Sequence, residues 1–336
     1  MIKMSRTGAG IRERKMKMKK TKERSKAQLT PLGRLARNLK RDWQLLVLIA
    51  FPVAYFIIFK YVPMAGLNIA FRNYKVGGQL FPVRGLNDWQ GFRWFKEFFE
   101  SPFSWRVIRN TLILSAEQLL VTFPAPIILA LLFNEIRHVR VKGFVQTVSY
   151  LPHFISVAVV VGIIYNIFSV NAGLVNEIRA RMGYEAIDFL QKAQYFRPLY
   201  VGSSLWQTAG FSSIIYAAAI AGVDQSLYEA AYIDGSTRFK NVFYITLPSI
   251  APTIITMLIL AIGRLMAVGY EKVLLMYTPA TYEVADIIST WVYRTGITNG
   301  KFSLAAAVDL FNSMINITLL VMANQLSKKL TDTSIF

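Results

Sequence analysis

Charged and amide side chains stand inside long apolar stretches of this 336-residue chain, where such groups are costly. In apolar surroundings they usually face protein or a water-filled path, so they are the first residues to consider for binding a polar solute. Together with aromatic rings they could hydrogen-bond to a hydroxyl-bearing solute and stack against it. The candidate path residues are Glu117, Gln118, Trp206, Gln207, Tyr216, Arg264, Tyr270, Asp309, Asn312 and Asn316.

The same polar side chains allow a second interpretation, because such groups also join helices by hydrogen bonds without touching a solute. Asp309, Asn312 and Asn316 step by three and four residues, so they would share one face of a helix. Arg264 could bind a carboxylate through its guanidinium, or it could simply neutralise Glu117.

The patterns needed for bond-making chemistry are missing. The sequence has no cysteine, and its two histidines, His138 and His153, offer no set of metal ligands. No Gly-x-x-x-x-Gly-Lys-[Ser/Thr] loop is present to hold nucleotide phosphates, and no Ser-His-Asp pattern or catalytic pair of carboxylates is found. We therefore expect no enzyme, no catalytic residue and no metal.

Apolar residues make up 54% of the sequence, which indicates that lipid surrounds much of the chain. Six apolar runs could each cross a hydrocarbon layer of about 30 Å as a helix of about 20 residues. The predicted fold class is therefore an all-α integral membrane protein with six transmembrane helices. The runs cover residues 43–62, 111–133, 145–168, 199–222, 250–268 and 302–324.

Basic residues predict the orientation of these spans. Residues 1–42 hold 15 of the 38 Lys and Arg but only three acids, so much of the net charge of +19 lies in one tail. Such a tail is retained in the cytoplasm and attracted to anionic lipid, and no motif suggests nucleic acid as a partner. We expect a basic cytoplasmic tail at 1–42, a six-span domain at 43–326 and a cytoplasmic tail at 327–336, with both termini in the cytoplasm.

The loop between the fourth and fifth runs, residues 223–249, carries the most specific pattern. Asp224 is a suitable helix N-cap, because its short carboxylate can accept from free backbone amides. Gly235 would end that helix in a turn that other residues adopt poorly. After it, a second amphipathic stretch would lie along the membrane until Leu247 and Pro248 enter the next span. Two short helices at an angle would form a rigid projection on which a partner protein could push.

The spacing from Glu229-Ala-Ala through Gly235 to Ile245-Thr-Leu-Pro248 resembles the EAA loop of permease subunits in binding-protein-dependent ABC importers. Ser236 stands where that family often has alanine. By this resemblance, the loop residues that couple the chain to an ATPase would be Glu229, Ala230, Ala231, Asp234, Gly235, Leu247 and Pro248.

The resemblance extends over roughly residues 43–330 and is to the carbohydrate-uptake branch of the maltose-permease type. The segments at 103–112, 150–156 and 215–224 carry it. Residues 30–34 together with 61–71 are most similar to permeases for complex oligosaccharides, including polyuronates such as alginate.

This resemblance implies the type I importer permease fold in a bacterial cytoplasmic membrane. The implied partners are a second permease subunit in a heterodimer, an ATPase dimer, an extracytoplasmic solute-binding protein and an oligosaccharide, which would be acidic if the polyuronate likeness holds. The chain itself would hold no cofactor, because ATP and Mg would be bound by the ATPase subunits.

Other functions remain open at this point. A permease of the same class could carry a solute other than a sugar. A secondary transporter would show inverted repeats and helices broken near the midplane, and Pro124 and Pro126 interrupt the second run without a matching break elsewhere. A membrane-embedded enzyme would need a catalytic cluster at the end of a span, and none is present.

Overall fold

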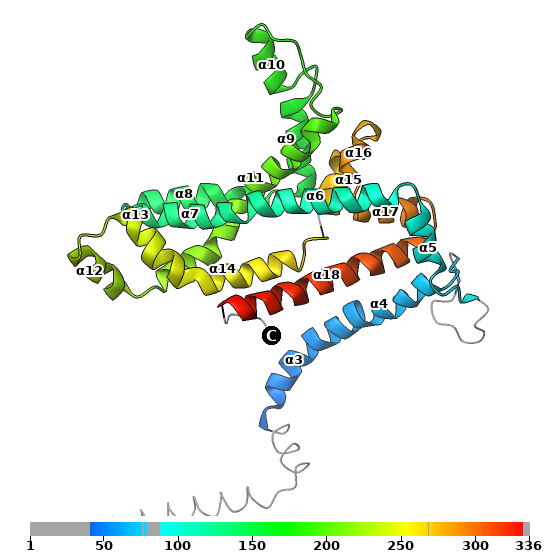
Figure 1. Ribbon diagram of the computed structural model, residues 1–336, viewed down its shortest axis with the longest axis horizontal. Helices are drawn as coiled ribbons and strands as arrows, with labels where there is room; N and C mark the ends of the chain where they lie inside the picture. The colour runs from blue at the N-terminus through cyan, green and yellow to red at the C-terminus, as the bar shows by residue number, and fades with distance from the viewer. Residues whose placement is uncertain (1–40, 76, 79–87, 268, 332–336) are drawn as a thin grey trace, which may run out of the picture. The chain divides into compact units, whose positions relative to one another are not determined.

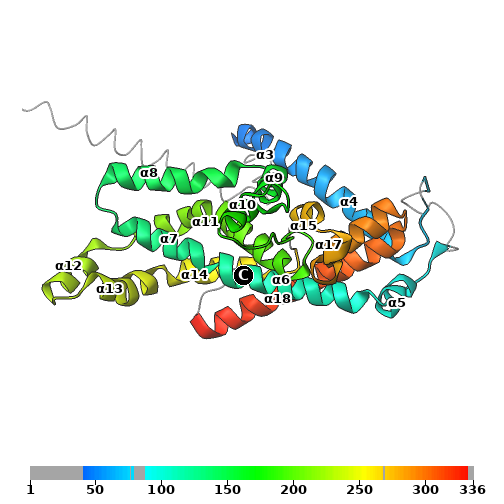
Figure 2. The same ribbon diagram turned by 90° about the horizontal axis from the view of Figure 1, so that it is seen from above.

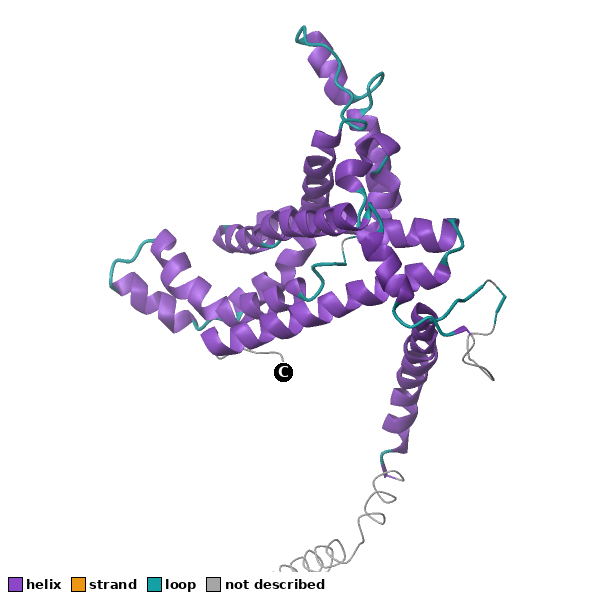
Figure 3. Cartoon of the chain, turned by 45° about the vertical axis from the view of Figure 1, so that its right-hand side comes forward, coloured by secondary structure: helices purple, strands orange, loops and turns teal. Residues whose placement is uncertain are grey.

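The computed structural model describes residues 41–75, 77–78, 88–267 and 269–331 (Figure 1). In these ranges the chain is helical and has no β-strand, and a single isolated bridge pairs Arg72 with Trp89 (Figure 3). The predicted all-α class is therefore confirmed. The predicted basic tail at 1–42 lies almost wholly outside the described residues.

The chain divides into two compact units, Met1–Gly66 and Leu67–Phe336. The described part of the first unit is a helix whose apolar side chains are exposed all round, as expected for a helix surrounded by lipid. It comprises α3 (Trp43–Phe56), the π-helical turn η1 (Ile57–Tyr61) and α4 (Val62–Met64), and it leads into the 3-10 helix η2 (Ala65–Phe71) at the unit boundary.

The second unit contains the remaining helices. Its first half comprises α5 (Arg93–Glu100), α6 (Ser104–Thr122), α7 (Pro124–Glu135), α8 (Val139–Tyr150), η4 (Leu151–Phe154), α9 (Val157–Phe168) and α10 (Leu174–Arg181). Its second half comprises α11 (Ala193–Ala221), α12 (Gln225–Ile233), α13 (Arg238–Asn241), η5 (Val242–Thr246), α14 (Leu247–Ile262), α15 (Tyr270–Met276), η6 (Pro279–Thr281), α16 (Tyr282–Ala285), α17 (Ile288–Tyr293), η7 (Arg294–Thr298) and α18 (Phe302–Thr331).

Among the described residues, four helices are long and apolar enough to cross a membrane, and a bent pair would make a fifth. The four are Trp43–Phe71, Ser104–Glu135, Arg238–Ile262 and Phe302–Lys329. The fourth predicted run corresponds to α11, whose 29 residues are long enough to cross but include more polar side chains. The predicted count of six is reached only if α11 and the bent pair are both spans.

The bent pair alters the third predicted run. Val139–Phe154 and Val157–Phe168 meet at an angle of 99°, so residues 145–168 do not form one straight helix. Ser156 starts the second helix by accepting a bond from the Val159 amide, and the Gln207 side chain donates to the freed Ile155 carbonyl at 2.9 Å. The break is therefore held by a contact with α11, which no local hydropathy pattern encodes.

The fifth run also differs from the prediction. The helix from Arg238 to Ile262 is continuous, so the stretch after Gly235 is the first part of this span and not a separate helix along the membrane. The helix ends before the predicted limit at residue 268. At the other end of the chain, α18 continues to Thr331, so half of the predicted 327–336 tail is helical.

Three apolar clusters make up the core of the second unit, and α11 contributes to two of them. One cluster surrounds Tyr200 between α6, α9, α11 and α15, and one surrounds Tyr216 between α7, α11 and α14. The third gathers Phe98 and Trp291 where α5, α17 and α18 meet. Seen from above, α11 lies among these elements (Figure 2).

Candidate functional site

The predicted loop forms a projection at one end of the second unit, here called the knob and comprising residues 224–241 (Figure 1). Asp224 accepts a hydrogen bond from the Ser226 amide at 3.0 Å, and this bond holds the pKa of the Asp224 carboxyl below its usual range. Gly235 has a φ of +70°, and its amide donates to the Tyr232 carbonyl at 3.1 Å. The predicted N-cap and glycine turn are confirmed.

The knob is tied to the span region at two points. The Tyr228 hydroxyl lies 2.8 Å from Thr246 Oγ1 at the base of α14, and Arg238 forms an ion pair of 3.6 Å with Glu135 at the end of α7. A cavity of about 280 Å³ lies between these contacts. Through these contacts α12 is bonded to the start of α14, and α13 to the end of α7.

The outer surface of the knob presents large apolar side chains among charged and polar ones. Tyr232 and Ile233 are 82% and 84% exposed, and Phe239 is 74% exposed. Glu229 is exposed and makes no ion pair with any described residue, and Ala230 beside it leaves room for close approach. Such a patch is typical of a protein contact surface.

The remaining predicted loop residues have different positions. Asp234 is the exposed C-cap of α12, and Ala231 is half-buried. Leu247 is partly buried against the cluster around Tyr216, while Pro248 is exposed in the first turn of α14. These two residues continue the helix into the span, as a rigid connection requires.

Two predicted path residues line one cavity. Gln118 on α6 and Arg264 enclose about 220 Å³ together with Ser115 and Thr122. Arg264 is exposed and follows the end of α14, so it lies in a turn and not inside the span as predicted. It forms no ion pair with the residues that the structure describes. A free guanidinium beside hydroxyl and amide groups could bind an acidic solute.

Asn312 and Asn316 hold the turn that carries Arg264. The Met266 amide donates to Asn316 Oδ1 at 3.0 Å, and Asn312 Nδ2 donates to the Met266 carbonyl at 3.4 Å. Asp309 lies on the same helix and is exposed. The two asparagines therefore hydrogen-bond α18 to the turn after α14. This agrees with the interpretation that polar side chains in the spans join helices and do not contact a solute.

Glu117 forms no ion pair with Arg264, so Arg264 does not neutralise it, as the sequence had left possible. Its carboxylate lies 3.7 Å from Arg197 on α11. Tyr216 is only 3% exposed and packs inside its cluster, and Gln207 is engaged at the helix break. Tyr216 and Gln207 thus serve packing and helix contacts in this conformation, whereas Glu117 and Arg197 line a separate cavity of about 450 Å³.

Two aromatic candidates remain accessible. Trp206 is 48% exposed and Tyr270 is 45% exposed, with the ring of Tyr270 about 6.1 Å from that of Tyr293. Gln118 accepts a long hydrogen bond of 3.5 Å from the Tyr200 hydroxyl. The structure thus brings Gln118 and Arg264 to one cavity but distributes the other predicted path residues over several contacts.

Sequence reasoning missed a buried ionic network. Asp286 is fully buried and accepts two bonds from Arg294, at 2.7 and 3.2 Å. Arg106 approaches the same carboxylate at 3.4 Å, and Thr290 donates to it at 3.0 Å. Asp286 lies outside the apolar runs, so neither hydropathy nor spacing signals that it is buried.

Comparison with known proteins agrees with this geometry. Residues 122–330 match the family described as binding-protein-dependent transport system inner membrane component. Protein LplB of Bacillus subtilis is 44% identical over 300 residues, covering 89% of this chain and 92% of that protein. The polygalacturonan/rhamnogalacturonan transport system permease protein YteP of the same organism is 41% identical over 305 residues, covering 90% and 93%.

A solved structure extends the match to three dimensions. A chain from the crystal structure of a bacterial alginate ABC transporter, in complex with an alginate pentasaccharide-bound periplasmic protein, superposes with a TM-score of 0.82 at 39% identity. The match covers 90% of this chain and 100% of that one. The resemblance inferred from the loop is therefore confirmed, and the chain belongs to the family of binding-protein-dependent transport system inner membrane components.

Proposed function

We propose that this chain is the permease subunit of an ATP-driven importer that carries an acidic oligosaccharide into the cell. The knob carries this proposal, because its exposed Glu229, glycine turn and apolar tip form a rigid surface against which an ATPase can push. The importer would also contain a second permease, an ATPase dimer and an extracytoplasmic binding protein. Both termini and the knob would face the cytoplasm.

Two observations favour an acidic sugar as the solute. Relatives with about two-fifths sequence identity include a permease for polygalacturonan and rhamnogalacturonan and a chain of an alginate transporter. In this chain the Arg264 guanidinium is exposed beside Gln118 and has no carboxylate partner among the described residues. A free guanidinium can hold a sugar carboxylate by two parallel hydrogen bonds.

The test is transport by the reconstituted complex. The chain would be produced with its second permease and ATPase subunits, placed in proteoliposomes and supplied with the loaded binding protein. We expect uptake of uronate oligosaccharides that requires ATP, and ATP hydrolysis that rises when the loaded binding protein is added. Uptake that continues without ATP, driven by an ion gradient, would reject the proposal in favour of a secondary transporter.

Replacing Arg264 tests its role in the path. We expect Arg264→Gln to raise the KM for an acidic oligosaccharide about tenfold, since a hydrogen-bonded charge contributes roughly 1.5–3 kcal/mol. Uptake of a neutral sugar of the same length should change little. Lys192→Gln, which removes an exposed positive charge away from this cavity, is the matched control. Unchanged uptake of the acidic sugar by Arg264→Gln would remove Arg264 from the path.

A further inference from the structure

Another cavity has a volume of about 430 Å³, and the helices that line it lie at the end of the second unit opposite the knob (Figures 1 and 2). It is enclosed by α5, the beginning of α6 and the segment from α16 to the start of α18. Its volume is within the range of small-molecule sites. With the knob in the cytoplasm, as proposed above, this cavity faces the outside of the membrane.

The wall of the cavity carries more positive than negative charge. Arg106 and Arg294 share the single buried carboxylate of Asp286, so one of the two guanidinium charges is left without compensation. Lys301 adds a further positive charge and Glu97 a negative one, and neither forms an ion pair with a described residue. The lining and the carboxylate behind it therefore have a net charge of about +1, counting each group in its usual ionised form.

Arg106 is the arginine with hydrogen-bonding capacity left over. Arg294 makes two bonds with Asp286, whereas Arg106 makes one long contact of 3.4 Å, and its buried Nε has no hydrogen-bond partner. The side chain of Arg106 is 29% exposed toward the cavity. A planar guanidinium in this state can donate to an incoming carboxylate, which a lysine could not hold in the same geometry.

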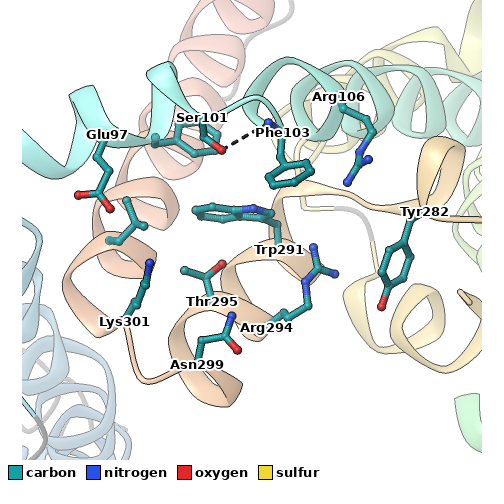
Figure 4. Close-up of a pocket in the computed structure, with 12 residues that line it drawn as sticks. Glu97, Ser101, Phe103, Arg106, Tyr282, Trp291, Arg294, Thr295, Asn299 and Lys301 are labelled. Carbon is teal, nitrogen blue, oxygen red and sulfur yellow. Dashed lines mark hydrogen bonds between the residues drawn. The ribbon is translucent and has the colours of Figure 1, made fainter. Parts of the chain in front are cut away.

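Aromatic side chains stand beside these charges. Figure 4 shows Trp291 at the centre of the cavity lining, with Phe103, Arg106, Tyr282 and Arg294 toward one side. Trp291 is only 7% exposed, whereas Phe103 is 48% exposed and offers the larger ring surface. The Trp291 ring is fixed by packing against Phe98, with ring centroids 5.2 Å apart. The exposed Phe103 ring and the partly exposed Tyr282 ring, next to a guanidinium that can bind a carboxylate, suit a sugar ring that bears an acid group.

We propose that this cavity holds one uronate unit of the oligosaccharide at the entrance of the path, with Arg106 as the partner of its carboxylate. The inference rests on the proposed function and extends it from the solute class to a particular site. An acidic side chain of the binding protein is the rival occupant, but a single carboxylate side chain would leave most of the 430 Å³ and the aromatic surface unused.

The test compares Arg106→Gln with Arg109→Gln, which removes an exposed charge from the same helix outside the cavity. Both are measured in the reconstituted complex with trisaccharides of galacturonate and of mannuronate and with their carboxyl-reduced, neutral counterparts. We expect Arg106→Gln to raise the KM for the acidic trisaccharide at least about tenfold and to leave the neutral one unchanged. The KM of Arg106→Lys for the acidic trisaccharide should lie between those of the wild type and Arg106→Gln. The KM of Arg109→Gln should match that of the wild type.

The outcomes separate this inference from the proposed function. If the wild type shows no preference for the acidic trisaccharides, both the acidic solute and the proposed subsite are wrong. If the wild type prefers them and Arg106→Gln keeps that preference, only the subsite is wrong. A loss of uptake that is equal for acidic and neutral sugars, with weaker binding of the binding protein in a pull-down, would assign the cavity to the binding protein. In Arg106→Gln, Asp286 keeps its ion pair with Arg294, so we expect this variant to fold. An unchanged midpoint of thermal unfolding is the check.

Discussion

At the scale of single residues, Gly235 is the position where backbone conformation matters most for the knob. Its φ of +70° lies in the left-handed region, and a Cβ added there would meet no atom within 4 Å. A larger side chain would therefore suffer only from the backbone conformation, which costs an L-residue roughly 1–2 kcal/mol and a β-branched residue more. The effect of a substitution should depend on its tolerance of this conformation, not on its size.

We therefore expect Gly235→Val to reduce ATP-dependent uptake at least about tenfold, because the turn that orients α12 against α13 is disfavoured. Asparagine adopts this conformation more readily, so Gly235→Asn should keep most of the activity. Uptake in proteoliposomes and the amount of protein inserted in the membrane are the measurements. Equal losses for valine and asparagine would mean that a contact surface, not the turn, is disturbed.

At the scale of helices, the sequence predicts those features that are set locally. The Asp224 N-cap and the Gly235 turn are predicted correctly. The cap depends only on the short side chain of Asp224, and the turn only on the absence of a side chain at Gly235. The break after Ile155 is not predicted, because the Gln207 bond that holds it comes from a distant helix. The ionic network around Asp286 is missed for the same reason.

The crossing of α8 and α11 is another contact that hydropathy cannot reveal. A Cβ at Gly210 would overlap the backbone carbonyl of Ser149, so the two helices approach as closely as they do only because this residue is glycine. A Cβ added at Gly202, on the same helix, would meet no atom of a neighbouring element within 4 Å. Small residues at interfaces commonly permit such close packing between membrane helices.

We expect Gly210→Ala to lower the stability of the purified protein by about 1–3 kcal/mol, the usual effect of overpacking. Gly202→Ala should be neutral or slightly stabilising, because alanine favours the helix by up to about 1 kcal/mol. Thermal unfolding of both variants in the same detergent compares them directly. If Gly210→Ala unfolds at the same temperature as Gly202→Ala, then α8 and α11 can move apart without loss of stability, and the prediction is wrong.

At the scale of the whole molecule, the knob and the cation-lined cavity stand at opposite ends of one helical unit (Figure 1). Between them lies the cavity with Gln118 and Arg264, which is bordered by the end of α14. Because α14 continues from the knob without a break, movement of the knob would reach Arg264 through one rigid helix. This arrangement would link the proposed ATPase contact on the knob to the proposed path, and it requires the knob to face the cytoplasm.

Cysteine labelling can test this orientation, since the native sequence has no cysteine. Tyr232 at the knob is 82% exposed, and Tyr184, in the segment between α10 and α11, is 59% exposed. We expect a membrane-impermeant maleimide to label Tyr184→Cys in intact spheroplasts and to label Tyr232→Cys only after the membrane is permeabilised. Both substitutions replace an exposed tyrosine, so each serves as the control for the other. Labelling of Tyr232→Cys from outside would invert the topology, and an ATPase in the cytoplasm could then not reach the knob.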